Sequence, residues 1–359
     1  MAPASDPGMG STTLALARKL RGAILGAAVA DALALPYQHY SRGFLRTVSS
    51  VMATRFETHH SGFYPRGQYS DDTQLLLALL ESVIESGGVD AQSIANHFVP
   101  LWRDNRLLER DDSYRAALER LARGAADADG CGAEPGHAEI APVTWCIGVG
   151  LWLHDEPVAL LPAVETATRL THTDPRTIAC AAAAAAAVAH TIRNDQLILG
   201  PFLDAMADAA SVHSEPIADA ILDFPRLLSM TNYRAWREFA SVCPDDAYPP
   251  STDGLSAYCI PSLLTAVQCF LESPNEYTGA VSRCMAAGGH IDTPACLTGA
   301  LVGALRGDDV VPAELVCTLV NNREIIDCAD RLVDAWAAKL GETGADEGRA
   351  GGAGGGEST

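Results

Sequence analysis

Two short segments far apart in the chain concentrate side chains that bind metal ions. The first is Ser70-Asp71-Asp72-Thr73, and the second runs from Gly288 to Thr293 and contains His290 and Asp292. Each segment stands directly before a long apolar stretch typical of a buried helix. Carboxylate and hydroxyl oxygens are the ligands that hard divalent cations take. If the two helix starts meet in the fold, they form a polar metal site in an otherwise apolar protein.

Helix capping is the simpler explanation of the first segment. Ser70 or Asp71 can cap a helix, and Gln74 completes a capping box three residues after Asp71. Taken alone, the segment favours capping. A cap needs only one acidic residue, however, and the adjacent carboxylates of Asp71 and Asp72 repel each other unless a cation lies between them.

The second segment also predicts a helix start, with Thr293 as the N-cap and Pro294 at the first helical position. Capping leaves His290 and Asp292 unexplained. Their spacing of two residues in an extended segment points both side chains to one side. The paired glycines Gly288 and Gly289 would let the backbone approach a ligand closely.

A third helix start and one isolated carboxylate complete the polar set. The segment Thr171-His172-Thr173-Asp174-Pro175 has the same form, although His172 taken alone is best explained as an ordinary buried histidine. Asp31 lies in the apolar stretch from Gly22 to Leu35, where an unpaired carboxylate would be costly. We therefore expect Asp31 to have a partner close to the site.

Composition limits the classes of partner. The 359 residues are 48% hydrophobic and 19% charged, as in a soluble globular protein, and the net charge is −20. This acidity argues against a nucleic-acid partner, but it leaves room for a small nucleotide held by helix starts and metal ions. The 10 cysteines form no CxxC pair, which predicts free thiols in a reducing cytoplasm and no zinc site.

Helical periodicity dominates the chain, and no alternating run predicts a strand. We expect an all-α protein, a compact multi-helix single-domain bundle over residues 12–340. Residues 1–11 and the Gly-rich tail 341–359 are expected to be disordered. No segment resembles a signal peptide, and the stretch 178–192 is too short to cross a membrane, so we expect a cytoplasmic protein without a membrane partner.

The predicted helices and loops fix where the polar segments lie. Loops are expected at 41–69 and 125–141, and loops of this length usually carry function or are disordered. The run of alanines at 181–187 predicts two closely approaching helices. Helices are expected near 14–35, 73–84, 91–101, 112–124, 142–153, 158–170, 175–193, 214–230, 256–272, 275–286, 293–306 and 312–339.

Taken in order, four segments make the chain resemble the ADP-ribosylglycohydrolase family. The family's G-x-x-x-G-D-A-L-G-x-P-x-E corresponds to Gly26–Gln38, and its G-Q-x-T-D-D-T corresponds to Gly67–Thr73. Its central T-H corresponds to Thr171-His172, and its closing G-G-D-T-D-T corresponds to Gly288–Thr293. The resemblance covers about residues 18–338.

The resemblance implies an all-α fold with a centre of one or two Mg²⁺ or Mn²⁺ ions and a nucleotide or ADP-ribosyl substrate. The implied metal ligands are Ser70, Asp71, Asp72, His290, Asp292 and Thr293. The implied catalytic residues are Asp71, Asp72, Asp292 and Gln38. The implied substrate contacts are Gly67, Gln68, His172, Gly288, Gly289 and Tyr258.

Three departures from the family pattern bear on the chemistry. Gln38 stands where the family has a glutamate, and an amide cannot act as an acid or a base. His290 replaces the first closing aspartate, and because imidazole suits Mg²⁺ poorly, the second ion site should be weakened. In the central segment Gly136–Pro142, Glu139 stands near the expected arginine.

Two functions follow from these residues. The first is a metal-dependent glycohydrolase that cleaves the N- or O-glycosidic bond of an ADP-ribosyl or related nucleotide-ribosyl group, with a small metabolite as one candidate substrate. The second is a catalytically impaired relative that binds ADP-ribose or serves structurally, which the losses at Gln38 and His290 favour. The retained acidic residues favour the enzyme, and the sequence leaves the oligomeric state open.

Overall fold

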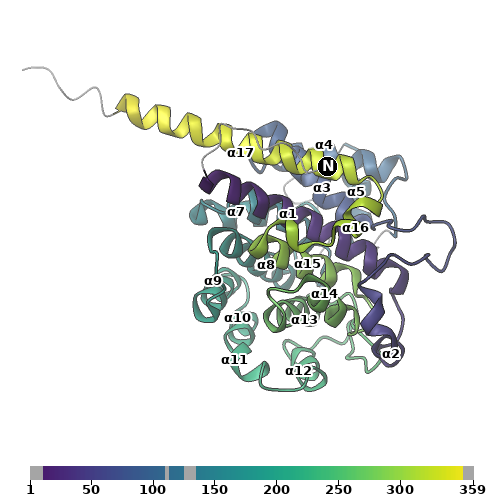
Figure 1. The fold of residues 1–359 in the computed structure, drawn as a ribbon. Helices are drawn as coiled ribbons and strands as arrows, with labels where there is room; N and C mark the ends of the chain where they lie inside the picture. The colour runs from purple at the N-terminus through teal and green to yellow at the C-terminus, as the bar shows by residue number, and fades with distance from the viewer. Residues whose placement is uncertain (1–10, 110–112, 125–134, 351–359) are drawn as a thin grey trace, which may run out of the picture.

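The protein folds as a bundle of helices, as seen in a computed structural model that describes residues 11–109, 113–124 and 135–350 (Figure 1). Within these residues there are no β-strands, only two isolated bridges, so the expected all-α class is confirmed. The α-helices are α1 (Ser11–Ala34), α2 (Arg42–Met52), α3 (Asp71–Ser86), α4 (Ala91–Arg103), α5 (Arg115–Ala122), α6 (Pro142–Trp152), α7 (Pro157–Arg169), α8 (Pro175–Arg193), α9 (Leu199–Ser211), α10 (Glu215–Leu222), α11 (Phe224–Leu227), α12 (Asn232–Phe239), α13 (Cys259–Glu272), α14 (Tyr277–Met285), α15 (Asp292–Arg306), α16 (Ala313–Thr318) and α17 (Asn322–Ala350).

Several helices differ from the sequence prediction. The region 41–69, predicted as a loop, contains α2, which Ser41 caps by accepting a hydrogen bond from the Phe44 amide. The helix predicted at 214–230 is divided into α10 and α11, since Pro225 cannot donate the hydrogen bond that a continuous helix needs. Helices α9 and α12 were not predicted.

The C-terminal part of the chain also differs from the sequence prediction. The helix predicted at 312–339 is divided into α16 and α17, with Asn321 between them at a φ of 55°. Helix α17 continues to Ala350, into the tail that was expected to be disordered, and its end extends past the other helices (Figure 1). The expectation of disorder for residues 1–10 and 351–359 lies outside the described residues.

The centre of the bundle is an antiparallel contact between α1 and α15, whose backbones touch. A Cβ atom added at Gly303 would lie 1.8 Å from the carbonyl oxygen of Gly22, and one added at Gly26 would lie 2.3 Å from that of Gly299. The spacing of four residues places both glycines of each helix on one face. Only glycine allows this separation, so these positions fix the register of the two helices.

Helix α1 is buried because it occupies this central position. The segment Leu14–Tyr37 is long and apolar enough to match a membrane span in length, but 89% of its most apolar window is buried inside the structure. A second close contact joins α6 to α8, where a Cβ at Gly150 would lie 2.5 Å from the carbonyl oxygen of Ala185. The alanine run therefore does mark closely approaching helices, as predicted.

The contact between α1 and α15 predicts that one change, glycine to alanine, affects stability very differently at two positions. Gly303→Ala should lower the free energy of unfolding by more than the ~1–3 kcal/mol typical of overpacking. The new Cβ would overlap backbone atoms of α1, which cannot change conformation to make room as a flexible side chain can. Gly200→Ala, in α9 with no atom within 4 Å of the new Cβ, should be neutral or stabilise the protein by about 0.5–1 kcal/mol. Urea unfolding of both variants checks this, and equal stabilities would contradict the close contact.

Candidate active site

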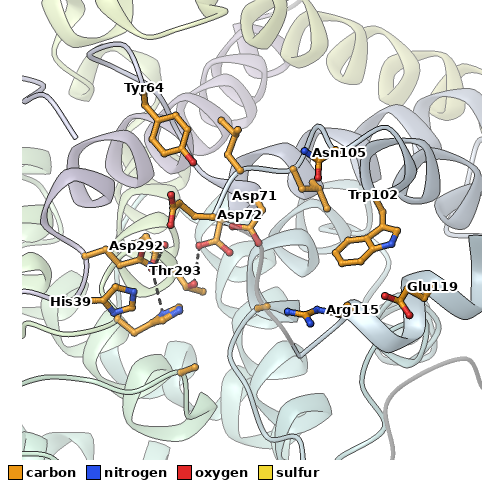
Figure 2. Close-up of a pocket in the computed structure, with 17 residues that line it drawn as sticks. His39, Tyr64, Asp71, Asp72, Trp102, Asn105, Arg115, Glu119, Asp292 and Thr293 are labelled. Atoms are coloured by element: carbon orange, nitrogen blue, oxygen red, sulfur yellow. Dashed lines mark hydrogen bonds and ion pairs between the residues drawn. The ribbon is translucent and has the colours of Figure 1, made fainter. Parts of the chain in front are cut away.

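A cleft of about 910 Å³ opens where the starts of α3 and α15 meet (Figure 2). Asp71 and Asp72 line it from the start of α3, and Asp292 and Thr293 line it from the start of α15. The turn after α1 contributes Gln38. The two segments that the sequence pointed to therefore border one cavity, although Asp72 and Thr293 are 221 residues apart.

The start of α3 is built around Asp31 of α1. The buried carboxylate of Asp31 accepts hydrogen bonds from the Ser70 amide at 3.1 Å and from the Thr73 hydroxyl at 2.6 Å. Asp31 thus has the partners that its burial required. Ser70 caps α3 by accepting from the Asp72 amide, but the predicted capping box does not form, because the side chain of Gln74 accepts from the Leu108 amide instead.

The start of α15 is joined directly to that of α3. The Thr293 hydroxyl donates a hydrogen bond of 2.8 Å to Oδ2 of Asp72. Helix α15 begins at Asp292, after Ile291, so the prediction of Thr293 as the N-cap is wrong by two residues. Thr293 lies in the first turn of the helix, where its hydroxyl is available to another segment.

Asp292 lies next to Gln38 and His290, two of the three departures from the family pattern. The Gln38 amide donates a 2.7 Å hydrogen bond from Nε2 to Oδ2 of Asp292. Nδ1 of His290 lies 3.4 Å from Oδ1 of Asp292, and neither of these two buried atoms has a hydrogen-bond partner. Both departures thus act on the same carboxylate.

Burial and mutual repulsion raise the pKa of two carboxyl groups near the cleft. The pKa of Asp72 lies well above its ordinary value, first because the group is buried and then because Asp292 is close. Burial, followed by repulsion from Asp292, raises the pKa of Asp31 to about 7, although its hydrogen bonds from Thr73 and Ser70 oppose this. A bound cation would offset both effects.

On the other side of the cleft, Asp71 is held by a buried tyrosine. The Tyr114 hydroxyl donates a hydrogen bond to Oδ2 of Asp71, and the Trp102 ring packs at 85° against that of Tyr114. No signal in the sequence pointed to these two aromatic residues. They lie around α4 and α5, whose residues carry no recognisable motif.

The candidate metal ligands at the cleft are carboxylate and hydroxyl oxygens, which are the ligand type that a hard divalent cation prefers. The unpartnered Oδ1 of Asp292 is one such donor. Within the described residues, however, no three His, Cys, Asp or Glu side chains are grouped closely enough to hold an ion as they stand. The carboxylates of Asp71 and Asp72 accept hydrogen bonds from protein hydroxyl groups, and each keeps further lone pairs with which it could bind an ion.

Gly288 and Gly289 do not line the cleft. Both have positive φ angles, of 72° and 78°. The Gly288 carbonyl accepts from the Leu255 amide, and the Gly289 carbonyl accepts from the His39 amide. These glycines bring backbone close to backbone, which places Gln38 and the start of α15 beside each other, and the substrate contact implied for them stays a prediction.

The other four implied substrate contacts also lie away from the cleft. Gly67 packs on the end of α16, where an added Cβ would lie 2.5 Å from the Thr318 carbonyl oxygen. The Gln68 amide donates to the carbonyl of Tyr69. His172 is fully buried, with Nε2 3.8 Å from Oε2 of Glu139. The buried Tyr258 donates from its hydroxyl to the Cys243 carbonyl.

Glu139 forms the centre of this neighbouring polar cluster. Its Oε1 accepts a hydrogen bond of 2.5 Å from the Tyr248 hydroxyl, whose pKa is raised by burial and by this carboxylate. The ring of Tyr248 stacks on that of Tyr258 at 5.0 Å. The substrate roles implied for His172 and Tyr258 therefore stay predictions.

Comparison with known proteins agrees with this architecture. The sequence model of the ADP-ribosylglycohydrolase family matches residues 12–341. An ADP-ribosyl-[dinitrogen reductase] glycohydrolase of Rhodospirillum rubrum is 26% identical over 89% of this chain and 96% of its own length. The ADP-ribosylhydrolase ARH3 of Xenopus tropicalis is 22% identical over 90% of this chain and 97% of its own.

A solved structure shows the same fold. It is described as an ADP-ribosylglycohydrolase-related protein complex, and it aligns with a TM-score of 0.68 over 89% of this chain and 99% of its own, at 20% identity. The family match spans nearly the whole chain, and the structure places Asp71, Asp72 and Asp292 at one cleft. The chain belongs to the ADP-ribosylglycohydrolase family, whose members are hydrolases that act on glycosyl bonds.

Proposed function

We propose that this protein hydrolyses the glycosyl bond between an ADP-ribosyl, or related nucleotide-ribosyl, group and its leaving group, and that it does so with a bound divalent cation. The observation that carries the proposal is the hydrogen bond from Thr293 to Asp72, because it joins the two ligand-bearing helix starts. The named activities of the relatives support the substrate class. The residues suit a cytoplasmic enzyme acting on a small nucleotide-derived metabolite.

The residues that would hold the cation carry the carboxylate, hydroxyl and imidazole groups at the two helix starts. They are Ser70, Asp71, Asp72, His290, Asp292 and Thr293. When bound, Mg²⁺ or Mn²⁺ would orient the ribose hydroxyls and polarise a water molecule. Because His290 replaces a carboxylate, we expect one firmly held ion and a weaker second site.

The chain's own groups have separate tasks in this reaction. The buried carboxylates place negative charge beside the anomeric carbon, where positive charge develops in an oxocarbenium-like transition state. Gln38 has no titratable proton, and its task is to hold Asp292 through the Nε2 hydrogen bond. The acidic residues therefore supply most of the acceleration, and Gln38 acts by positioning.

Asp292→Asn should abolish hydrolysis and cation binding together. The substitution keeps the shape of the side chain and removes the charge at the centre of the donor set, so the loss should exceed the roughly 10–100-fold typical of altered groups around a ligand. Initial rates on an ADP-ribosylated peptide and the thermal shift caused by Mn²⁺ measure the two effects. The exposed Asp309→Asn is the control. A near-natural rate for Asp292→Asn would refute the metal-dependent mechanism.

Changes at Gln38 should separate positioning from chemistry. Gln38→Ala should cost about 1–3 kcal/mol in transition-state stabilisation, because it leaves Asp292 without a buried hydrogen bond. Gln38→Glu places a carboxylate against Asp292, so it should lower the melting temperature without a cation and recover it with Mn²⁺. We expect its rate on ADP-ribosylated peptides to rise. A rate for Gln38→Ala as low as that of Asp292→Asn would show that positioning does not describe its role.

His290→Asp should tighten Mg²⁺ binding on the order of tenfold, since it adds a hard oxygen ligand next to Asp292. Calorimetric titration of the metal-free protein with Mg²⁺ gives the affinity and the number of ions. We expect one tight ion in the unaltered chain and two in the variant. Two equally tight Mg²⁺ ions in the unaltered chain would contradict the weakened second site.

A further inference from the structure

One arm of the cleft plays no part in the chemistry proposed above. From Asp71 the cleft continues between α4 and α5, where Trp102, Asn105, Arg115 and Glu119 line it (Figure 2). We call these four residues the α4–α5 arm. In Figure 2 the carboxylates lie between this arm and His39.

The aromatic ring of the arm is fixed next to the reacting carboxylates. The Trp102 ring centroid lies 6.3 Å from that of Tyr114, which is fully buried. Tyr114 also donates its hydroxyl hydrogen bond to Asp71. One rigid side chain therefore holds both the indole ring and a carboxylate, so a group stacked on Trp102 would be attached to, or very near, the ribose at that carboxylate.

Non-glycine residues with positive φ angles occur around the same cleft. Of the five described non-glycine residues with positive φ, three line it, namely His39, Asn105 and Glu109. Such conformations persist only where the surroundings enforce them, and they gather at ligand-binding sites. Only Asn105 belongs to the α4–α5 arm, where it follows the last residues of α4, so the backbone geometry marks the cleft as a whole rather than this arm.

The polar groups of the arm select a particular chemistry. Arg115 and Glu119 are four residues apart and lie on one face of α5, so the arm presents hydrogen-bond donors beside an acceptor. The Asn105 amide supplies one of each. Planar heteroaromatic rings carry ring nitrogens and carbonyl or amino groups that match this alternation, and they stack on indole.

We propose that the α4–α5 arm binds a planar heteroaromatic leaving group attached through nitrogen to the reacting ribose, stacked on Trp102. The assignment rests on the proposed glycohydrolase function. In the reaction the bond between the anomeric carbon and the ring nitrogen breaks, and its electron pair stays on the nitrogen. Water adds its hydroxyl to the anomeric carbon. Its proton goes to a leaving ring that was neutral before cleavage, as in a hypoxanthine riboside, and to solvent where the ring was a cation, as in a nicotinamide riboside.

Binding measurements on the full chain test the assignment. The probes are nicotinamide and hypoxanthine as free rings, ribose 5-phosphate as a ribosyl group without a ring, ADP-ribose, and agmatine as a planar cation. Trp102→Ala should weaken binding of the two free rings about 5- to 100-fold, the usual loss for a stacked base. Trp102→Phe, which keeps an aromatic face, should change it less than about threefold. Phe63→Ala, an exposed aromatic residue outside the cleft, is the control and should change nothing.

Three other outcomes of the binding measurements would each overturn the assignment in a distinct way. Unchanged ring binding in Trp102→Ala means that the arm is not a ring subsite. A loss confined to ADP-ribose places the adenine there instead, and a loss confined to agmatine makes the arm a guanidinium site. Hydrolysis is assayed separately. If the unaltered chain cleaves no ribosyl substrate but Trp102 still governs ring binding, the proposed function fails while the ring subsite stands.

Discussion

The backbone contact between α1 and α15 is the constraint on which the site depends. Gly26 and Gly299 come from distant parts of the chain, yet their backbones touch, and this sets the register of two antiparallel helices. Asp31 lies five residues after Gly26, and Asp292 lies seven residues before Gly299, so the contact carries both carboxylates to the same end of the helix pair. Asp31 then organises the start of α3 through Ser70 and Thr73. A side chain at either glycine would move the two halves of the site apart.

Crowding of negative charge is the electrostatic consequence of this arrangement. Asp72 and Asp31 have raised pKa values because both are buried close to Asp292. The protein reduces this repulsion with hydroxyl groups and with the Gln38 amide, which donates to Asp292 where a carboxylate could donate only if protonated. Gln38 therefore makes the cation-free state easier to hold, and a glutamate at this position would make the site depend more strongly on an ion. Glutamine in place of the family's glutamate therefore does more than remove a catalytic group. It lets a protein hydrogen bond, rather than a bound metal ion, offset part of the negative charge of Asp292.

The sequence predicted the parts of the site that depend on local chemistry. A buried carboxylate without a nearby partner implied a distant one, and Asp31 has it. Tertiary packing decided the rest. The Gly288-Gly289 pair was expected to approach a ligand, but glycine permits close approach to any group, and here that group is the backbone near His39 and Leu255. Trp102 and Tyr114 were missed because no spacing rule connects an aromatic pair on short helices to a carboxylate that precedes it by more than 30 residues.

The pairing of α1 with α15 also imposes an order on how the protein can be made. During synthesis α1 and the acidic start of α3 leave the ribosome early, whereas the glycine face of α15 follows only after about 300 residues have been joined. Until then the Gly22 and Gly26 face of α1 has no native partner, and the long-range contact that closes the bundle is necessarily among the last to form. A nascent chain therefore carries the acidic residues well before it can assemble a cleft. It is in this interval that a chaperone would have the most apolar surface to cover.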